Sequence, residues 1–225
     1  MTEISGVKKK NVLIVEDHPL FRAMLRQLVE SELEMKVCGE TNNIRDAMAI
    51  IEHARPDLAI VDITLPGPSG LELIKDLKAR GIPVPVLILS MHEETLYAER
   101  VIRAGGRGYI SKQEAPSEVV KAIRSVMAGG IYVSERVSAG FVERLGSLRK
   151  ATGPEGMEAL SDREVEVFLL IGQGLNSRDI SKRLNLGQTT IDTYRQRIKE
   201  KMGLENAADL YQRAVRWVAE RGMQS

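Results

Sequence analysis

The chain has 225 residues, 43% of them hydrophobic and 28% charged, so it can bury a sizeable core and form two modest domains. Its formal net charge of +1 indicates neither nucleic acid nor membrane binding by itself, so any basic surface must be local. No apolar run has the length of a membrane span or a signal peptide, and the single cysteine, Cys38, excludes an internal disulfide and a thiolate metal site. These features are typical of a cytoplasmic protein.

The first half of the chain alternates short apolar runs with segments of helical periodicity. Strands are expected over residues 12–15, 36–39, 58–61, 84–89 and 108–110. Helices are expected over residues 19–30, 43–53, 69–80, 93–104 and 116–127. Start and stop signals agree, because Ser69 with Glu72 forms a capping box and Gly81 follows the third helix. Five strand–helix units predict an α/β domain with a doubly wound, five-stranded parallel sheet over residues 11–128.

The second half of the chain has a different pattern. Residues 129–157 are rich in glycine at both edges, and we expect a linker here with one helix over residues 134–148. Beyond it no strand pattern occurs. Helices are expected over residues 161–171, 177–184, 189–202 and 206–220, which predicts a small all-α four-helix domain over residues 158–221.

Charged side chains follow three of the predicted strands. Glu16 and Asp17 come directly after the first strand, Asp62 ends the third, and Lys112 follows the fifth. Because the carboxyl ends of parallel strands meet at one edge of a sheet, these groups are expected in a single cleft. Each of them alone would be an ordinary loop residue, whereas the whole set predicts a magnesium and phosphoryl site.

Each role in such a site has a residue of a suitable type. An aspartate can accept a phosphoryl group as an acyl phosphate when a cation neutralises the phosphoryl oxygens. Mg²⁺ prefers oxygen ligands, and we expect Asp17 and Asp62 to bind it directly, with Glu16 acting through water. Thr64 offers its main-chain oxygen as a further ligand. The groups expected to bind phosphoryl oxygens are Lys112 and Ser90.

Four segments resemble a known family. Residues 15–19 (VEDHP), 61–66 (VDITLP), 89–90 (LS) and 109–112 (YISK) are similar to the receiver domain of bacterial two-component response regulators. The resemblance implies a flavodoxin-like sheet of strand order 2-1-3-4-5. It also implies that Asp62 takes a phosphoryl group from a sensor histidine kinase, while Ser90 and Tyr109 shift toward the phosphate as the switch.

The end of the chain carries a second resemblance. Residues 160–164 (LSDRE), 172–180 (GQGLNSRDI), 190–194 (TIDTY) and 201–204 (KMGL) resemble the LuxR-type helix-turn-helix of the NarL/FixJ class of response regulators. By this resemblance, Asp192, Thr193 and Gln196 meet base edges in the major groove, and their neighbours anchor phosphates. The full set expected to contact DNA is Thr189, Thr190, Asp192, Thr193, Arg195, Gln196, Arg197 and Lys199.

The expected recognition helix has two faces and a basic surrounding. Ile191, Tyr194, Ile198 and Met202 recur at intervals of three and four, so they are expected to face the core. Between residues 178 and 201, seven basic residues against three acidic ones give a local charge of +4, as a DNA-binding surface requires. Two positions depart from the family pattern. Asp192 stands where a basic residue is frequent, and Gly187 stands where a capping serine is usual.

Together these features predict a phosphorylation-activated, DNA-binding transcription regulator. It is not expected to be an enzyme beyond weak dephosphorylation of itself. The expected cofactor is Mg²⁺. The expected partners are a sensor histidine kinase, double-stranded promoter DNA and, after phosphorylation, a second copy of the chain in a homodimer, with no membrane.

Three other classes of protein share part of this pattern. A phosphatase of the haloacid-dehalogenase class also uses an aspartyl phosphate and Mg²⁺, but it needs an acid two residues after the nucleophile, where Thr64 stands. A constitutive DNA-binding protein with a silent receiver would not need the intact acidic set. A ligand-sensing quorum regulator that shares only the tail would need an apolar pocket in place of that set.

Overall fold

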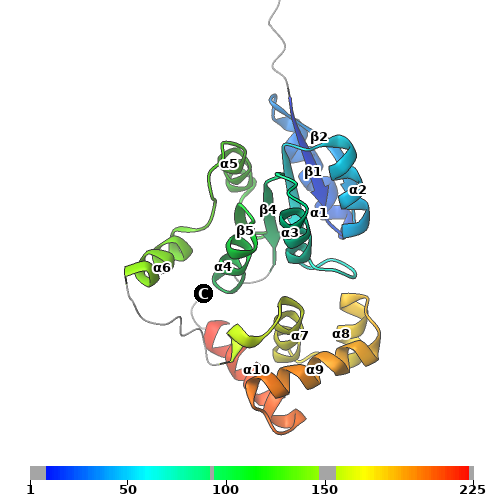
Figure 1. Cartoon of the computed structure of the whole chain (residues 1–225), viewed down its shortest axis with the longest axis vertical. Coiled ribbons are helices and arrows are strands. Elements are labelled where there is room, and N and C mark those ends of the chain that lie inside the picture. Colours follow the sequence, from blue (N-terminus) through cyan, green and yellow to red (C-terminus); the bar gives the residue numbers. More distant parts are fainter. Residues whose placement is uncertain (1–8, 92–93, 147–155, 223–225) are drawn as a thin grey trace, which may run out of the picture. The chain divides into compact units, whose positions relative to one another are not determined.

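The computed structural model describes residues 9–91, 94–146 and 156–222 (Figure 1). The chain divides into two compact units, one ending at Gly146 and the other beginning after it. Within the described residues, no helix combines the length and the apolar character needed to cross a membrane.

The first unit is built on a five-stranded parallel sheet. Its strands are β1 (Lys10–Val15), β2 (Met35–Thr41), β3 (Leu58–Asp62), β4 (Val86–Ser90) and β5 (Gly108–Ser111). Their order in space is β2-β1-β3-β4-β5, and every neighbouring pair is parallel. The predicted fold class and strand order are therefore confirmed.

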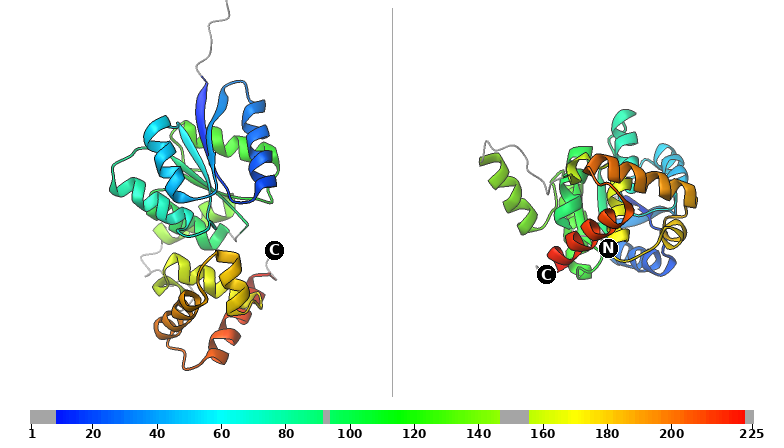
Figure 2. Two further views of the ribbon diagram at one scale, coloured as in Figure 1. Left: turned by 90° about the vertical axis from the view of Figure 1, so that its right-hand side faces the viewer. Right: turned by 90° about the horizontal axis from the view of Figure 1, so that it is seen from below.

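Helices cover both faces of this sheet (Figure 2). They are α1 (Pro19–Ser31), α2 (Ile44–Ala54), α3 (Gly70–Ala79), α4 (Glu94–Ala104) and α5 (Pro116–Met127), and a further helix, α6 (Glu135–Gly146), packs on α4. On one side α1 packs against α5, whereas α3 packs between α2 and α4. Each helix begins and ends close to the predicted position where the structure describes it. The predicted start of α4 at residue 93 and the predicted end of α6 at residue 148 lie outside the described residues.

The central strands are buried on both faces, which explains why their sequences are continuously apolar rather than alternating. Every residue of β3 and β4 is buried. One core cluster joins β1, β3, β4 and β5 to α1 and α5. The strand β4 begins at Val86, two residues later than predicted, because Pro83 and Pro85 have no N–H to donate to a neighbouring strand.

A short segment after α5, residues 131–134, lies along the outer edge of β5, and we call it the β5 strap. The N–H of Tyr132 donates to the carbonyl of Arg107 at 3.0 Å, and the N–H of Tyr109 donates to the carbonyl of Tyr132 at 2.9 Å. These bonds form a parallel bridge between Tyr132 and Gly108. The sequence places the strap in the linker, whereas these bonds attach it to the sheet.

Side chains reinforce the β5 strap. The hydroxyl of Tyr132 donates to Glu118 of α5 at 3.1 Å, and the N–H of Ser134 donates to Glu94 of α4 at 2.7 Å. Burial and the hydrogen bond to Glu118 raise the pKa of Tyr132 to about 12, so its hydroxyl keeps the donated proton at neutral pH. The helix α6 then packs against α4, which explains why it belongs to the first unit.

The second unit contains the four predicted helices and a short 3-10 helix before them. The elements are η1 (Met157–Ala159), α7 (Asp162–Gly172), α8 (Ser177–Leu184), α9 (Gln188–Met202) and α10 (Ala207–Gly222). The helix α7 packs against α9 and α10, with Phe168 edge-on to Trp217 at 6.2 Å between ring centroids. Ser161 caps α7, and its N–H donates back to Glu164 at 2.7 Å, as the predicted capping box requires.

The packing of α7 on α10 generates a test of the second unit. A Cβ on Gly172 would lie 2.5 Å from the carbonyl oxygen of Ala214 and 2.5 Å from a methyl of Val218. We expect Gly172→Ala to lower the free energy of unfolding of this unit by about 1–3 kcal/mol, because α10 must move away. Urea titration followed by the fluorescence of Trp217, the only tryptophan of the chain, measures this change.

Gly187→Ser is the matched control for Gly172→Ala. Its Cβ meets only the hydroxyl of Thr190 at 3.6 Å, which is an ordinary contact. The new hydroxyl can accept a hydrogen bond at the start of α9, so we expect a gain of a few tenths of a kcal/mol. Equal stability of Gly172→Ala and the wild type would contradict the close approach of α7 and α10.

Candidate functional site

The predicted acids and the lysine meet at the carboxyl edge of the sheet. Because β1 and β3 are neighbours, Glu16 and Asp17 lie beside Asp62. The Nζ of Lys112 is 2.7 Å from Oε2 of Glu16 and 2.8 Å from Oδ2 of Asp62. Glu16, Asp62 and Lys112 have side chains no more than 5% exposed, so this is a buried ion-pair network.

The main chain around Asp62 also positions its carboxylate. The N–H of Thr64 donates to Oδ1 of Asp62 at 3.1 Å, while Lys112 holds the other oxygen. Gly70, the first residue of α3, lets this loop fold tightly, because a Cβ there would lie 2.4 Å from the carbonyl oxygen of Asp62. The ammonium of Lys112 lies 4.7 Å from the centre of the Phe21 ring, which shields it from one side.

Burial dominates the ionisation of Asp62. Desolvation raises its pKa from 3.8 to about 6; Lys112 opposes the rise and Glu16 adds to it. The cluster holds three carboxylates against one ammonium, so part of its negative charge is not neutralised by the side chains themselves. Such a cluster favours the binding of a cation.

The residues present fit a hard divalent cation. Ligand atoms of Glu16, Asp17, His18 and Asp62 all lie within 4.8 Å of one another. Carboxylate oxygens are the ligands that Mg²⁺ prefers, and three carboxylates in one place repel each other unless a cation lies between them. Thr64, the predicted main-chain ligand, lies in the loop that follows Asp62, the last residue of β3.

Both predicted switch residues are buried, and one of them is bonded to Lys112 of this cluster. Ser90 ends β4 and Tyr109 lies in β5, and neither side chain is exposed. The carbonyl of Ser90 accepts a hydrogen bond from the N–H of Lys112 at 2.8 Å, which connects the end of β4 to the lysine. Tyr109 is bound through its main chain to Tyr132 of the β5 strap.

The sequence did not assign three residues that the structure brings to the site. His18 is the N-cap residue of α1, and its Nδ1 lies 2.8 Å from Asp17 and 3.2 Å from Glu16. The guanidinium of Arg22 donates to the carbonyl of Glu16 at 2.6 Å. Only the position of His18 next to two acids offered a signal, since the contacts of Arg22 and Phe21 depend on how α1 packs.

The predicted recognition helix, α9, presents the expected faces. Ile191 and Ile198 are fully buried, and Tyr194 and Met202 are half-buried. The side chains of Arg195 and Lys199 are half-buried. The remaining predicted DNA contacts are exposed, namely Thr189, Thr190, Asp192, Thr193, Gln196 and Arg197. Gly187 at the N-cap gives no side-chain hydrogen bond, as expected.

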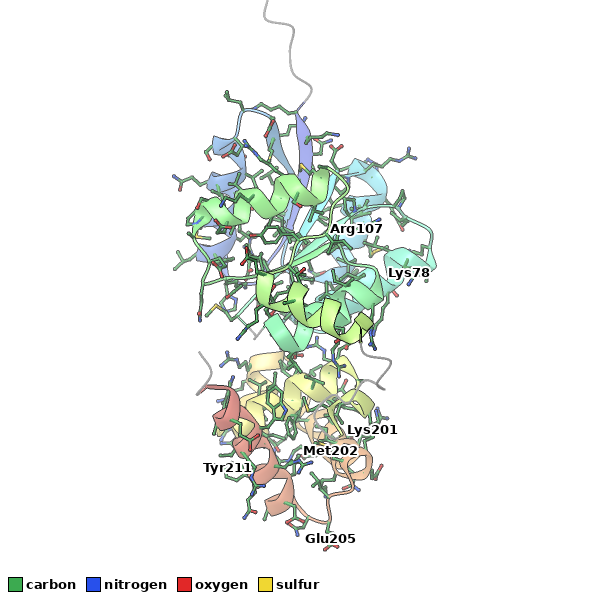
Figure 3. All side chains as sticks on the ribbon, turned by 90° about the vertical axis from the view of Figure 1, so that its left-hand side faces the viewer. Lys78, Arg107, Lys201, Met202, Glu205 and Tyr211 are labelled. Atoms are coloured by element: carbon green, nitrogen blue, oxygen red, sulfur yellow. The ribbon has the colours of Figure 1, made fainter. Side chains whose placement is uncertain are left out.

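The basic surface of α9 is weaker than the sequence count suggests. The Nζ of Lys201 lies 2.6 Å from Oε2 of Glu164, a residue that is 2% exposed (Figure 3). Burial alone would raise the pKa of Glu164, but hydrogen bonds from Lys201 and Ser161 outweigh it and lower the pKa. The positive charge of Lys201 is therefore neutralised within the protein, and including Glu164 reduces the local charge from +4 to +3.

Comparisons with known proteins agree with both units. Residues 12–124 match the family described as Response regulator receiver domain, and residues 158–214 match the family described as Bacterial regulatory proteins, luxR family. The chain is 34% identical to the response regulator UvrY of Escherichia coli K12 over 92% of this chain and 94% of UvrY. It is also 34% identical to the transcription regulator BvgA of Bordetella pertussis over 91% of this chain and 96% of BvgA.

A solved structure gives the same result. RcsB from Salmonella enterica serovar Typhimurium, bound to promoter P1flhDC in the presence of the phosphomimetic BeF3⁻, is similar with a TM-score of 0.56. The two chains are 26% identical over 92% of this chain and 100% of that one.

The first unit is a receiver domain, and the second is a helix-turn-helix domain. The chain therefore belongs to the NarL/FixJ-class response regulators, which join a receiver domain to a LuxR-type DNA-binding domain. Membership of a family of transcription regulators contradicts the phosphatase alternative. A receiver match across the first unit contradicts the ligand-sensing alternative.

The buried charge of Asp62 predicts an unusual effect of its removal. Because its pKa is higher in the folded chain, the folded state keeps a proton between about pH 4 and 6 that the unfolded chain has released. Stability therefore falls as the pH rises through this window. At pH 7.5 without divalent cations, we expect Asp62→Asn to raise the free energy of unfolding by about 1–3 kcal/mol.

Urea titrations at pH 7.5 and at pH 4 measure this effect, and the gain from Asp62→Asn is expected to be lost at the lower pH. Added Mg²⁺ is expected to stabilise the wild type and not the variant. Asp76→Asn, at an exposed position of α3, is the control and is expected to change stability by less than about 0.5 kcal/mol. A destabilised Asp62→Asn variant at pH 7.5 would show that the cluster tolerates the charge.

Proposed function

We propose that a sensor histidine kinase phosphorylates Asp62 and that the phosphorylated chain dimerises and binds promoter DNA. The observation that carries this proposal is the buried network of Lys112, Asp62 and Glu16 in the same chain as the exposed polar face of α9. The buried network can accept and hold a phosphoryl group, and α9 can enter a major groove of DNA.

The chemistry begins at the carboxylate of Asp62. An oxygen of Asp62 attacks the phosphorus atom, and the bond between phosphorus and the imidazole nitrogen of the kinase histidine breaks as that nitrogen leaves. Bound Mg²⁺, held by Asp17, Asp62 and the carbonyl of Thr64 with Glu16 acting through water, would neutralise charge on the phosphoryl oxygens. Lys112, already 2.8 Å from Asp62, supplies a positive charge to one of those oxygens.

Loss of the phosphoryl group needs only a water molecule that attacks the same phosphorus atom. We assign no general base to this step, so dephosphorylation by the chain itself is expected to be weak.

The phosphoryl group would change the contacts of the switch residues. Ser90 ends β4 beside the cluster, and its hydroxyl can donate to a phosphoryl oxygen. Tyr109 in β5 would shift together with Ser90. Because the N–H of Tyr109 is bonded to the carbonyl of Tyr132, a shift of β5 would be passed to the β5 strap. The strap leads into α6, so the change reaches the residues that precede the DNA-binding domain.

On the DNA side, the exposed residues of α9 suit two tasks. Gln196 can pair with adenine and Asp192 can accept a hydrogen bond from cytosine. Gln196 now donates to Glu200 at 2.8 Å, so this bond must break when a base is read. Arg197 suits a phosphate contact because it is exposed and charged. Because promoter DNA is reached in the cytoplasm, we expect the chain to act there.

Phosphorylation of Asp62 has a direct test. With acetyl phosphate and Mg²⁺, we expect intact mass spectrometry to show one added species of about 80 Da, which corresponds to a single phosphoryl group. Asp62→Asn and chelation of Mg²⁺ are expected to abolish it, whereas Asp76→Asn is expected to retain it. Sedimentation is expected to show dimers only in the labelled samples. Labelling of Asp62→Asn to the wild-type level would rule out this acceptor and favour a constitutive DNA-binding protein.

Replacing Arg197 and replacing Lys201 are expected to have different effects on DNA binding. Arg197→Ala is expected to reduce the slope of log affinity against log salt concentration by about 1, since one phosphate contact is lost. Lys201→Met is expected to leave this slope unchanged, because its charge is already paired with Glu164. The measurement is fluorescence anisotropy of the phosphorylated chain on a labelled duplex at salt concentrations between about 50 and 200 mM. Over this range, the loss of roughly one phosphate contact changes the slope measurably. An unchanged slope for Arg197→Ala would exclude its phosphate contact.

A further inference from the structure

We propose that a pocket at the amino edge of the receiver sheet binds a small anion with an apolar body. The pocket has a volume of about 430 Å³, which lies in the range of small-molecule sites. It is formed by the ends of α3 and α5, the start of β4 and the turn between α4 and β5. This proposal does not depend on phosphorylation of Asp62.

The walls of the pocket select an apolar ligand. Most of the lining side chains are aliphatic, with Ile74 and Leu77 from α3, Val84 and Val86 around the start of β4, and Val126 from α5. Pro83 and Pro85, which also line the pocket, have no N–H groups. A sugar or a nucleotide base would therefore lose its hydrogen bonds to water without replacing them, whereas an alkyl chain would not.

Two cations at the pocket select a negative charge. Lys78 lies in the last turn of α3, and Arg107 lies just before β5 (Figure 3). Both side chains are exposed, and in the described part of the chain neither has an ion-pair partner. The lining includes no acidic residue. A carboxylate placed between Lys78 and Arg107 would balance this charge while its apolar chain covers the aliphatic wall.

The turn that forms one wall of the pocket packs closely on its neighbours. Gly105 has a φ of +115°, and its Cβ position lies 3.4 Å from Cδ of Lys78. Gly106 is buried and would place a Cβ 2.5 Å from a methyl of Val101. Because a larger residue would clash at Gly106, the turn can approach Val101 closely and lies beside the alkyl part of Lys78.

The pocket and the acidic cluster lie at opposite ends of the same strand. β4 runs from Val86, which lines the pocket, to Ser90, which lies beside Asp62. Four residue steps of a strand separate them by about 13 Å. Binding at the pocket can therefore be measured in the unphosphorylated chain, and failure of one site leaves the other intact.

Octanoate is a suitable probe for this pocket, with 1-octanol and acetate as probes of its two halves. By ¹⁵N NMR titration of the full chain, we expect octanoate to shift the amides of Val84, Val86 and Arg107 with a Kd on the order of 0.1–1 mM. Octanol and acetate are each expected to bind at least about tenfold more weakly. If acetate bound as well as octanoate, the site would recognise charge alone, and if octanol did so, it would recognise the apolar chain alone. Either result would overturn the proposal.

Variants separate the pocket from general surface charge. Lys78→Gln with Arg107→Gln is expected to weaken octanoate binding about tenfold, from two exposed charge contacts. The matched control is Lys36→Gln with Arg45→Gln, which removes two exposed charges elsewhere and is expected to leave the Kd unchanged. Val84→Trp, which fills the pocket, is expected to abolish binding. Binding that survives the Lys78 and Arg107 changes, or an absence of shifts with octanoate, would sink the proposal.

Discussion

The charge imbalance at the carboxyl edge of the sheet is the constraint on which the rest of the receiver depends. Three carboxylates and one ammonium meet there, with Glu16 and Asp62 nearly removed from water. Burial raises the pKa of Asp62 to about 6, so the ionised form is costly without further positive charge. The strand order makes this arrangement unavoidable, because β1 and β3 are neighbours and β5 brings Lys112 across the end of β4. A site with excess negative charge is stabilised when a cation binds in it.

Much of this arrangement was predictable because it follows from strand ends. A continuous apolar run fixes a buried parallel strand, and the residue after it must lie at the carboxyl edge, so Glu16, Asp17, Asp62 and Lys112 converge by topology alone. The β5 strap could not be predicted in the same way, since a single bridge at Tyr132 leaves no periodicity in the sequence. The contacts of Phe21 and Arg22 depend on the packing of α1, which sequence spacing does not determine.

In the second unit too, the sequence predicted which residues are buried but not which residues contact each other. Helical spacing assigned Ile191 and Ile198 to the core of α9 correctly, because burial follows the 3.6-residue period. It could not show that Lys201 is held by Glu164, since the two residues come from different helices and are 37 positions apart. A count of charges along a sequence treats every lysine as available to DNA. In the folded unit, a buried carboxylate that would be costly alone takes up one of them, and the same bond holds the end of α9 to the start of α7.

Under the proposed function, coupling between the acidic cluster and the linker requires few moving parts. Gly108 lets the β5 strap lie directly on the strand, because a Cβ there would be 2.9 Å from the carbonyl oxygen of Tyr132. Two hydrogen bonds hold Tyr132 to this edge of the sheet, one from the N–H of Tyr109 in β5 and one to the carbonyl of Arg107 just before it. A displacement of β5 therefore either carries the strap with it or breaks those bonds. The strap is also bonded to α4, because the N–H of Ser134, the residue before α6, donates to Glu94. Under the proposed function, the strap thus offers a continuous bonded path from β5 to the residue before α6.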